Sequence, residues 1–170
     1  MTVYIGLLRA VNVGGTGRLP MADLKAMCEA AGFTNVETYI ASGNVVFEAR
    51  GAEGIVKTRL ESRLRAYAGK AVDVLLRTAP EMAAVVAANP FPDAPANLTM
   101  AVFLDTVPPA DTLTAITGQA DEDVRVGKRE IYICYPNGQA ATKLKVRAAA
   151  AGTARNMNTV AKLAAMAAER

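Results

Sequence analysis

The sequence predicts an α/β (α+β) fold of two ferredoxin-like halves with antiparallel sheets, and three observations lead to this prediction. Apolar runs of strand length and amphipathic helical stretches follow the order β-α-β-β-α-β over residues 1–78. A proline-rich segment at 89–95 can hold neither a helix nor a central strand. The order of elements then starts again, although the residues themselves do not repeat. We therefore predict one half at 1–78, a helix and linker at 79–97, and a second half with C-terminal helices at 98–170.

The elements of the first half are bounded by glycines and by changes in apolar spacing. Strands are expected at 3–8, 36–40, 45–47 and 72–76. Two helices are expected at 21–31 and 53–68, because Gly32 and Gly69 follow them in the position that commonly ends a helix. Ser42 and Gly43 indicate a compact hairpin between the second and third strands.

The second half gives a less regular pattern. A further helix opens after the first half, because Thr78 and Glu81 have the spacing of a capping box. Strands are then expected at 98–104, 124–126 and 131–135, with helices at 109–117, 139–151 and 155–168. A second helix therefore stands where the final strand of the repeat would be.

The composition excludes several classes of chemistry. The chain has no histidine, which rules out Ser–His and Cys–His nucleophilic pairs and histidine metal ligands from this chain. Its two cysteines, Cys28 and Cys134, lack the spacing of a zinc or thioredoxin-type site. Cys28 falls on an apolar helical stripe and Cys134 in an apolar strand, so both are expected to be reduced and buried. We predict no metal and no cofactor.

The charge and hydropathy of the chain indicate a soluble, cytoplasmic protein. No apolar run reaches the roughly 18 residues that span a bilayer, and the first ten residues lack the features of a signal peptide. The net charge is +3, so the basic balance alone does not argue for nucleic acid. We expect no membrane partner. The acidic cluster at 121–123 is interpreted as a solvated turn, with a magnesium site as the weaker alternative.

Several short motifs lie along the chain: RAVNVGG at 9–15, MADL at 21–24, GF at 32–33, TYI at 38–40, SGNVVF at 42–47, NPF at 89–91 and RNMNTVAKL at 155–163. Together they resemble the motifs of the bacterial DUF1697 family. Residue 157 is Met where the family often has Trp. The resemblance covers nearly the whole chain and implies an α/β fold with ferredoxin-like halves. It implies no biochemical activity, because the family is named for having none assigned.

The topology predicts a candidate site at one edge of the first sheet. In a β-α-β-β-α-β unit the strand order is 4-1-3-2, so the end of the first strand lies beside the start of the third. This arrangement brings together hydrogen-bond donors that are far apart in sequence: Arg9, Asn12, Gly14, Gly15, Ser42 and Asn44. A guanidinium with amides and glycine-rich backbone favours an anionic ligand. The alternative is that Asn12, Ser42 and Asn44 are turn residues that bond to their own backbone. The glycines complete neither a dinucleotide fingerprint nor a P-loop.

A second cluster falls on one face of the last expected helix. Its members are Arg155, Asn158, Thr159 and Lys162, at helical spacings of three and four. The interpretation as a solvated face of an amphipathic helix is weighed against a role as a second wall of the candidate site.

The sequence therefore predicts an uncharacterised bacterial protein that binds a small anionic molecule, and it leaves open whether a reaction is catalysed. A nucleic-acid-binding module is the first alternative, because residues 3–8 look like the first strand of an RNA-recognition sheet. It is disfavoured, because Asn44 and Val46 stand where stacking rings would be needed. A scaffold or partner-binding protein is the second alternative, through the alanine-rich stretches 148–151 and 161–168. The sequence specifies neither the ligand nor the oligomeric state.

Overall fold

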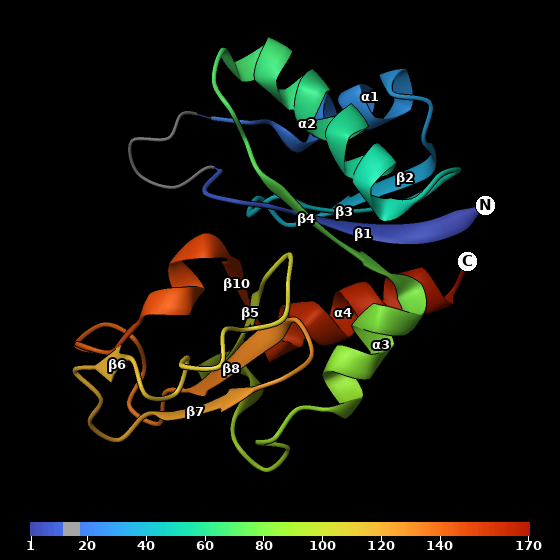
Figure 1. The fold of residues 1–170 in the computed structure, drawn as a ribbon. Helices are drawn as coiled ribbons and strands as arrows, with labels where there is room; N and C mark the ends of the chain where they lie inside the picture. Colours follow the sequence, from blue (N-terminus) through green and yellow to red (C-terminus); the bar gives the residue numbers. More distant parts are fainter. Residues whose placement is uncertain (12–17) are drawn as a thin grey trace. The chain divides into compact units, whose positions relative to one another are not determined.

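A computed structural model describes residues 1–11 and 18–170 of the chain (Figure 1). The chain divides into two compact units. Unit 1 comprises Met1–Met82 and Leu163–Arg170, and unit 2 comprises Ala83–Lys162.

Unit 1 is built on a four-stranded antiparallel sheet. Its elements follow the predicted order: β1 (Thr2–Leu8), α1 (Met21–Ala30), β2 (Thr34–Tyr39), β3 (Asn44–Ala49), α2 (Glu53–Ala68) and β4 (Val74–Thr78). The strand order is β2-β3-β1-β4, so β1 pairs with both β3 and β4. This is the 4-1-3-2 order expected of a β-α-β-β-α-β unit.

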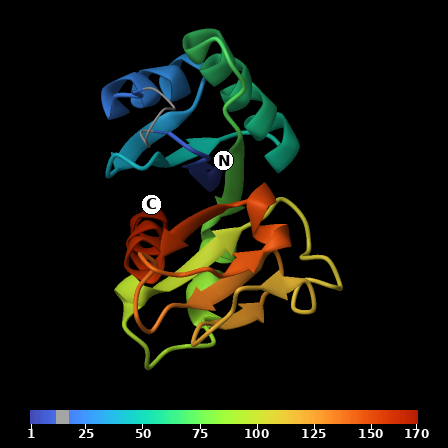
Figure 2. The same ribbon diagram turned by 90° about the vertical axis from the view of Figure 1, so that its left-hand side faces the viewer.

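The core of unit 1 lies between the sheet and its two helices, which cover one face of the sheet (Figure 2). The alternation of side chains along a strand sends Tyr4 and Leu8 of β1 and Val45 and Phe47 of β3 to this face. The helices contribute buried residues at helical spacing, which are Leu24 and Cys28 from α1 and Val56, Leu60 and Leu64 from α2. Phe33 stacks on Phe47 with the ring centroids 4.3 Å apart.

Both cysteines are free and buried, as predicted. Burial raises the pKa of the Cys28 thiol to about 12. Cys28 therefore acts as a small apolar core residue, because only the thiolate is a strong nucleophile.

The outer edge of β4 is bonded to side chains of α2. The Val74 amide donates to Glu61 Oε2 at 3.0 Å, and Lys57 donates to the Val74 carbonyl. Lys57 and Glu61 also form an ion pair at 3.2 Å, one helical turn apart. On the inner side of the strand, the neighbouring Asp73 carbonyl accepts from the Arg9 amide at 2.9 Å. The backbone groups that β4 turns away from β1 at Val74 are thus satisfied within the unit.

Helix α3 (Ala79–Ala87) follows β4 and opens with the predicted capping box. The Thr78 amide donates to Glu81 Oε1 at 2.8 Å, and the Glu81 amide donates to Thr78 Oγ1 at 3.3 Å. These two bonds satisfy backbone donors that the first turn of a helix leaves free.

Unit 2 contains a second four-stranded antiparallel sheet with the order β10-β5-β8-β7. Its strands are β5 (Thr99–Phe103), β7 (Asp123–Val126), β8 (Glu130–Cys134) and β10 (Thr153–Asn156). A small separate pair joins β6 (Ile116–Thr117) to β9 (Lys145–Val146). Two 3-10 helices, η1 (Ala96–Leu98) and η2 (Arg147–Ala151), also belong to unit 2. Helix α4 (Met157–Ala168) begins in unit 2, and its residues from Leu163 onward belong to unit 1. The mixed α+β class with antiparallel sheets is confirmed.

Three helices predicted for the second half are wrong or shortened. Residues 109–117 form turns that end in β6, and residues 139–151 form turns, β9 and η2. The helix predicted at 155–168 begins at Met157, because Asn156 Oδ1 accepts the Thr159 amide at 3.0 Å and caps it. Residues 153–156 instead pair with β5 as β10, which supplies the final strand that the sequence pattern did not show.

Within the described residues, no helix combines the length and the apolarity that crossing a membrane requires.

The Asn156 cap gives a first testable prediction. Asn156→Ala should lower the free energy of unfolding by about 1 kcal/mol, because the Thr159 amide loses its acceptor. Urea denaturation followed by circular dichroism measures the change. Asn158→Ala, at an exposed position of α4, is the matched control and should change stability by less than about 0.5 kcal/mol. Equal losses in the two variants would show that Asn156 does not set the start of α4.

Candidate functional site

The end of β1 and the start of β3 lie side by side, as the topology predicts. Leu7 is paired with Asn44, and the Leu8 amide donates to the Gly43 carbonyl at 2.9 Å. Arg9 therefore leaves β1 beside the hairpin that enters β3. We call this end of the unit 1 sheet the β1 edge, and it consists of residues 9–11, the hairpin 40–44 and the chain at 70–73.

Gly43 allows the hairpin to pack closely against β1. Its φ of 86° lies in the left-handed region, and a Cβ at this position would stand 2.6 Å from Val11 Cγ2 and 2.9 Å from Leu8 Cβ. Only glycine meets both the conformational and the spatial requirement. The hairpin and Val11 are therefore in direct contact.

Asn44 and Ser42 brace this hairpin. Asn44 is fully buried, and its Nδ2 donates to the Tyr39 carbonyl and to Ser42 Oγ, at 3.0 Å in both cases. These bonds have the local character that is typical of turn residues. The Asn44 amide thus holds the shape of the β1 edge.

Arg9 lies on the β4 side of the edge. Its Nη1 is 3.6 Å from Asp73 Oδ2, and its side chain is 39% exposed. An ion pair of this exposure contributes little to stability. Three other predicted ligand-binding residues, Asn12, Gly14 and Gly15, lie outside the described residues.

The residues of the second predicted cluster lie on two different elements of the structure. Arg155 lies in β10 rather than on α4, so the prediction that it shares one helix face with Asn158 and Lys162 is wrong. Its Nη1 donates to Thr153 Oγ1 at 2.8 Å and to the Ala154 carbonyl at 3.0 Å, and burial lowers its pKa to about 10. Asn158 and Lys162 are exposed on α4, whereas Thr159 is buried.

A cavity of about 260 Å³ opens at the β1 edge of unit 1. We call it the edge cavity. Its described lining residues come from the end of β1, the start of α1 and the end of α2, and they are Ala10, Val11, Arg18, Leu19, Leu64, Tyr67, Ala68, Lys70 and Val72. Val11 therefore contacts the hairpin through Gly43 and also lines the cavity.

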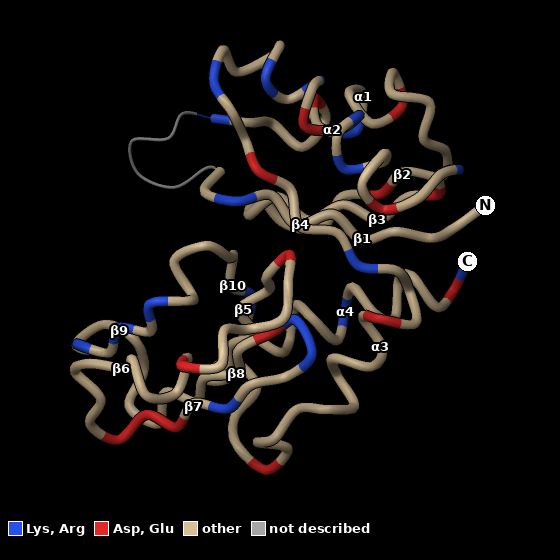
Figure 3. The backbone as a smooth tube through the Cα atoms, in the orientation of Figure 1, with Lys and Arg blue, Asp and Glu red and all other residues tan. Residues whose placement is uncertain are grey.

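The charge of the edge cavity is positive. Arg18 and Lys70 are the only charged residues among the described residues that line it, and most of the others are apolar. Figure 3 shows basic residues where the chain leaves β1, enters α1 and leaves α2. The Tyr67 hydroxyl donates to Asp23 Oδ2 at 2.6 Å, and this hydrogen bond is the main cause of the raised pKa of Tyr67. The arrangement suits an anionic group attached to a small apolar body.

Two residues at the β1 edge have strained backbone conformations. Ala10 and Ile40 have φ values of 55° and 51°, in the left-handed region that side chains other than glycine rarely adopt. Such a conformation costs of order 1–3 kcal/mol, and it persists where the surroundings impose it, often at functional sites.

Sequence reasoning named the edge but missed Arg18 and Lys70. The signal was the topology itself. In a β-α-β-β-α-β unit, the start of α1 and the end of α2 lie at the same edge as the end of β1. Arg18 precedes α1 by a few residues and Lys70 follows Gly69 at the end of α2, so the same argument that selected Arg9 could have selected both.

The family described as "Protein of unknown function (DUF1697)" matches residues 1–132. The chain belongs to the DUF1697 family. The resemblance seen in the motifs is therefore confirmed, and the description of the family assigns no function.

A solved structure supports the fold of this DUF1697 protein. The chain matches the conserved bacterial protein SP0830 from Streptococcus pneumoniae with a TM-score of 0.81 and 24% sequence identity, over 98% of each chain. At this identity the likeness establishes the fold alone. No curated protein matches the chain.

Unit 2 has a cavity of its own beside the acidic cluster, of about 270 Å³. The prediction of a solvated turn is wrong for Glu122, which is only 7% exposed. Its carboxylate accepts from the Ala120 amide at 2.7 Å and from Thr142 Oγ1. The bond from Thr142, followed by that from the Ala120 amide, lowers its pKa. Within the described residues, no group of three or more acidic or cysteine side chains could hold a metal ion.

Gly43 gives a second prediction. Gly43→Ala should lower the free energy of unfolding by about 2–4 kcal/mol, because it adds both left-handed strain and overlap with Val11. Gly69→Ala is the matched control, since Gly69 has a φ of 72° and nothing within 4 Å of its added Cβ. The control should lose only about 1 kcal/mol in the same denaturation measurement. If both variants lost the same amount, the packing of the hairpin on Val11 would be disproved.

Glu122 gives a third prediction, on pH. A carboxyl with a lowered pKa in the folded state stabilises the fold above its unfolded pKa, and the contribution is lost as pH falls through the folded pKa. The melting temperature of the parent should therefore exceed that of Glu122→Gln at pH 7, and the gap should close below about pH 4. Thr142→Val should remove part of the gap, because it removes one donor. A gap that stays constant from pH 7 to pH 3 would contradict this role.

Proposed function

We propose that the protein binds a small anionic ligand in the edge cavity of unit 1. The observation that carries the proposal is the pair of cations, Arg18 and Lys70, in a lining that is otherwise mostly apolar and has no acidic residue among its described members. Both side chains are exposed, so the two cations add to each other's attraction for an anion, and salt in solution screens that attraction.

The lining narrows the chemical class of the ligand. The Arg18 guanidinium offers a planar pair of donors, which suits a carboxylate or phosphate, and Lys70 adds a compact positive charge. Leu19, Leu64 and Val72 offer apolar surface. The volume of about 260 Å³ lies just below the roughly 300–1,000 Å³ of typical ligand pockets, so only a compact ligand fits. A compact carboxylate or phosphate ester with an apolar body fits these conditions.

The proposed site lies at the β1 edge, as the sequence predicted, but different residues contact the anion. Ser42 and Asn44 hold the hairpin that supports Val11, and Arg9 lies at the surface beside Asp73. Arg18 and Lys70 take the role of anion contacts. We propose binding and assign no catalytic step.

We also propose a bacterial protein that acts in the cytoplasm. The two cysteines are free, which suits a reducing compartment, and the solved structural neighbour is bacterial.

A nucleic-acid-binding module is the weaker hypothesis. Asn44 and Val46 occupy the positions where an RNA-recognition sheet displays stacking rings, and both side chains are fully buried. Binding of single-stranded oligonucleotides that falls steeply with salt would revive it.

Calorimetric titration with small probes tests the proposed function. Phenyl phosphate and benzoate represent apolar anions, inorganic phosphate represents the charge alone, and benzyl alcohol represents the apolar body alone. We expect the two apolar anions to bind most tightly. Arg18→Ala and Lys70→Ala should each weaken their binding by roughly tenfold or more, as for the loss of a charge-assisted hydrogen bond.

Lys25→Ala is the matched control, because Lys25 is an exposed cation on α1 and does not line the cavity. It should change the affinity less than twofold. The proposal fails if no anionic probe binds more tightly than benzyl alcohol, or if the double variant of Arg18 and Lys70 binds the anions as the parent does.

A further inference from the structure

Strand β2 carries a bulge where its pairing with β3 shifts. Thr34 is paired with Glu48 and Glu37 with Val46, so the two residues Asn35 and Val36 lie opposite the single residue Phe47. Asn35 has a φ of 50°, which agrees with the local kink. A bulge of this kind leaves backbone carbonyls outside the regular ladder, and they need other donors.

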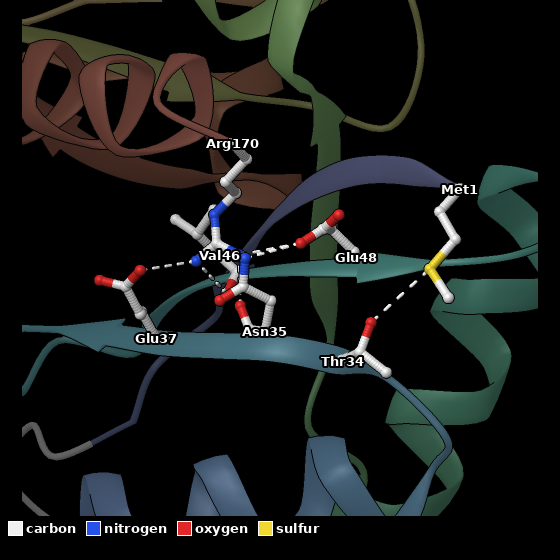
Figure 4. A network of polar contacts seen from close by, with 7 residues as sticks. All are labelled: Met1, Thr34, Asn35, Glu37, Val46, Glu48 and Arg170. Carbon is white, nitrogen blue, oxygen red and sulfur yellow. Dashed lines mark hydrogen bonds and ion pairs between the residues drawn. The ribbon is translucent and has the colours of Figure 1, made fainter.

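Arg170 of unit 1 supplies these donors (Figure 4). Its Nη1 donates to the Asn35 carbonyl, and its Nη2 approaches the Val46 carbonyl at 3.5 Å. Two carboxylates flank the same guanidinium: Nη2 is 2.9 Å from Glu37 Oε1, and Nη1 is 3.5 Å from Glu48 Oε2. The Arg170 side chain is only 3% exposed. We call the group formed by Asn35, Glu37, Val46 and Glu48 the acidic bulge.

The geometry of the acidic bulge is specific for a guanidinium. Each terminal nitrogen meets one carbonyl and one carboxylate, so the planar fork is used on both of its arms. A lysine ammonium has a single nitrogen and could not serve both arms at once. Glu48 is itself held in place, because Asn35 Nδ2 donates to its Oε2 at 2.7 Å. The site is thus built from one strand bulge and two carboxylates, of which Glu48 is anchored by Asn35 and Glu37 is 59% exposed.

We propose that the acidic bulge is a guanidinium-binding site with Arg170 as its resident ligand. It recognises the shape of the guanidinium as well as its charge. When Arg170 is removed, the site takes an alkylguanidinium ligand or the arginine side chain of another peptide. With two carboxylates against one cation, the charge balance favours a cationic occupant. The inference does not depend on the proposed function, because none of these residues lines the edge cavity.

Chemical rescue tests this inference. Arg170→Ala should lower the melting temperature by about 3–8 °C, the range expected for the loss of a few such contacts in a chain of this size. Ethylguanidinium at low millimolar concentration should raise the melting temperature of Arg170→Ala and leave that of the parent unchanged. Ethylammonium at the same concentration and ionic strength should have no such effect.

Two further variants make the test decisive. Arg170→Lys keeps the charge without the fork and should lose most of the stability that Arg170→Ala loses. Replacing Glu37 and Glu48 with Gln in the Arg170→Ala background should abolish the rescue. The inference is overturned if Arg170→Lys melts as the parent does, if ethylammonium rescues as well as ethylguanidinium, or if rescue persists without the two carboxylates.

Discussion

The pairing of β1 with strands on both of its sides is the constraint on which unit 1 depends. Because β3 and β4 both run antiparallel to β1, the starts of these two strands lie beside the end of β1. The connections then bring the start of α1 and the end of α2 to the same edge. Gly43 brings the hairpin into contact with Val11, which in turn lines the cavity. The position of the basic residues is therefore a consequence of strand order, and no local motif is needed to produce it.

The two units reach the same strand order by different means. In unit 1, two helices cover one face of the sheet and contribute Leu24, Cys28, Val56, Leu60 and Leu64 to its core. In unit 2, irregular segments connect the strands, and the buried cluster draws instead on residues such as Leu104, Val146 and the partly buried Leu144. Glu122 and Thr142 bond to each other across two of these segments. The same strand order is thus compatible with irregular connections, provided that other residues cover the apolar strands and satisfy the buried polar groups.

Sequence reasoning was most reliable for a periodicity that extends over many residues and for a motif of fixed spacing. The helical stripe of α2 and the capping box at Thr78 and Glu81 are local signals, and the structure contains both. It failed where the signal was short. A helix was predicted at 139–151 because the segment is rich in alanine. The alternation of basic and apolar residues at 143–147, which is typical of a strand, is too short to outweigh that signal, and part of the segment is β9. The sequence reasoning placed Arg155 on a helix because its spacing to Asn158 is helical. In the structure, the pairing with β5 gives Arg155 an extended backbone, and the Asn156 cap starts the helix after it.

The contacts that the sequence could not show are those set by tertiary packing. Nothing near Arg170 in the chain indicates that it meets a strand more than a hundred positions away. The bonds of Lys57 and Glu61 to the Val74 backbone are also tertiary contacts that the sequence did not show. They affect how the sheet can pair with another chain. An unpaired sheet edge is a template for intermolecular strand addition and for fibril growth. By occupying the outward amide and carbonyl of Val74, α2 removes one donor and one acceptor that a foreign strand would need at that end of β4.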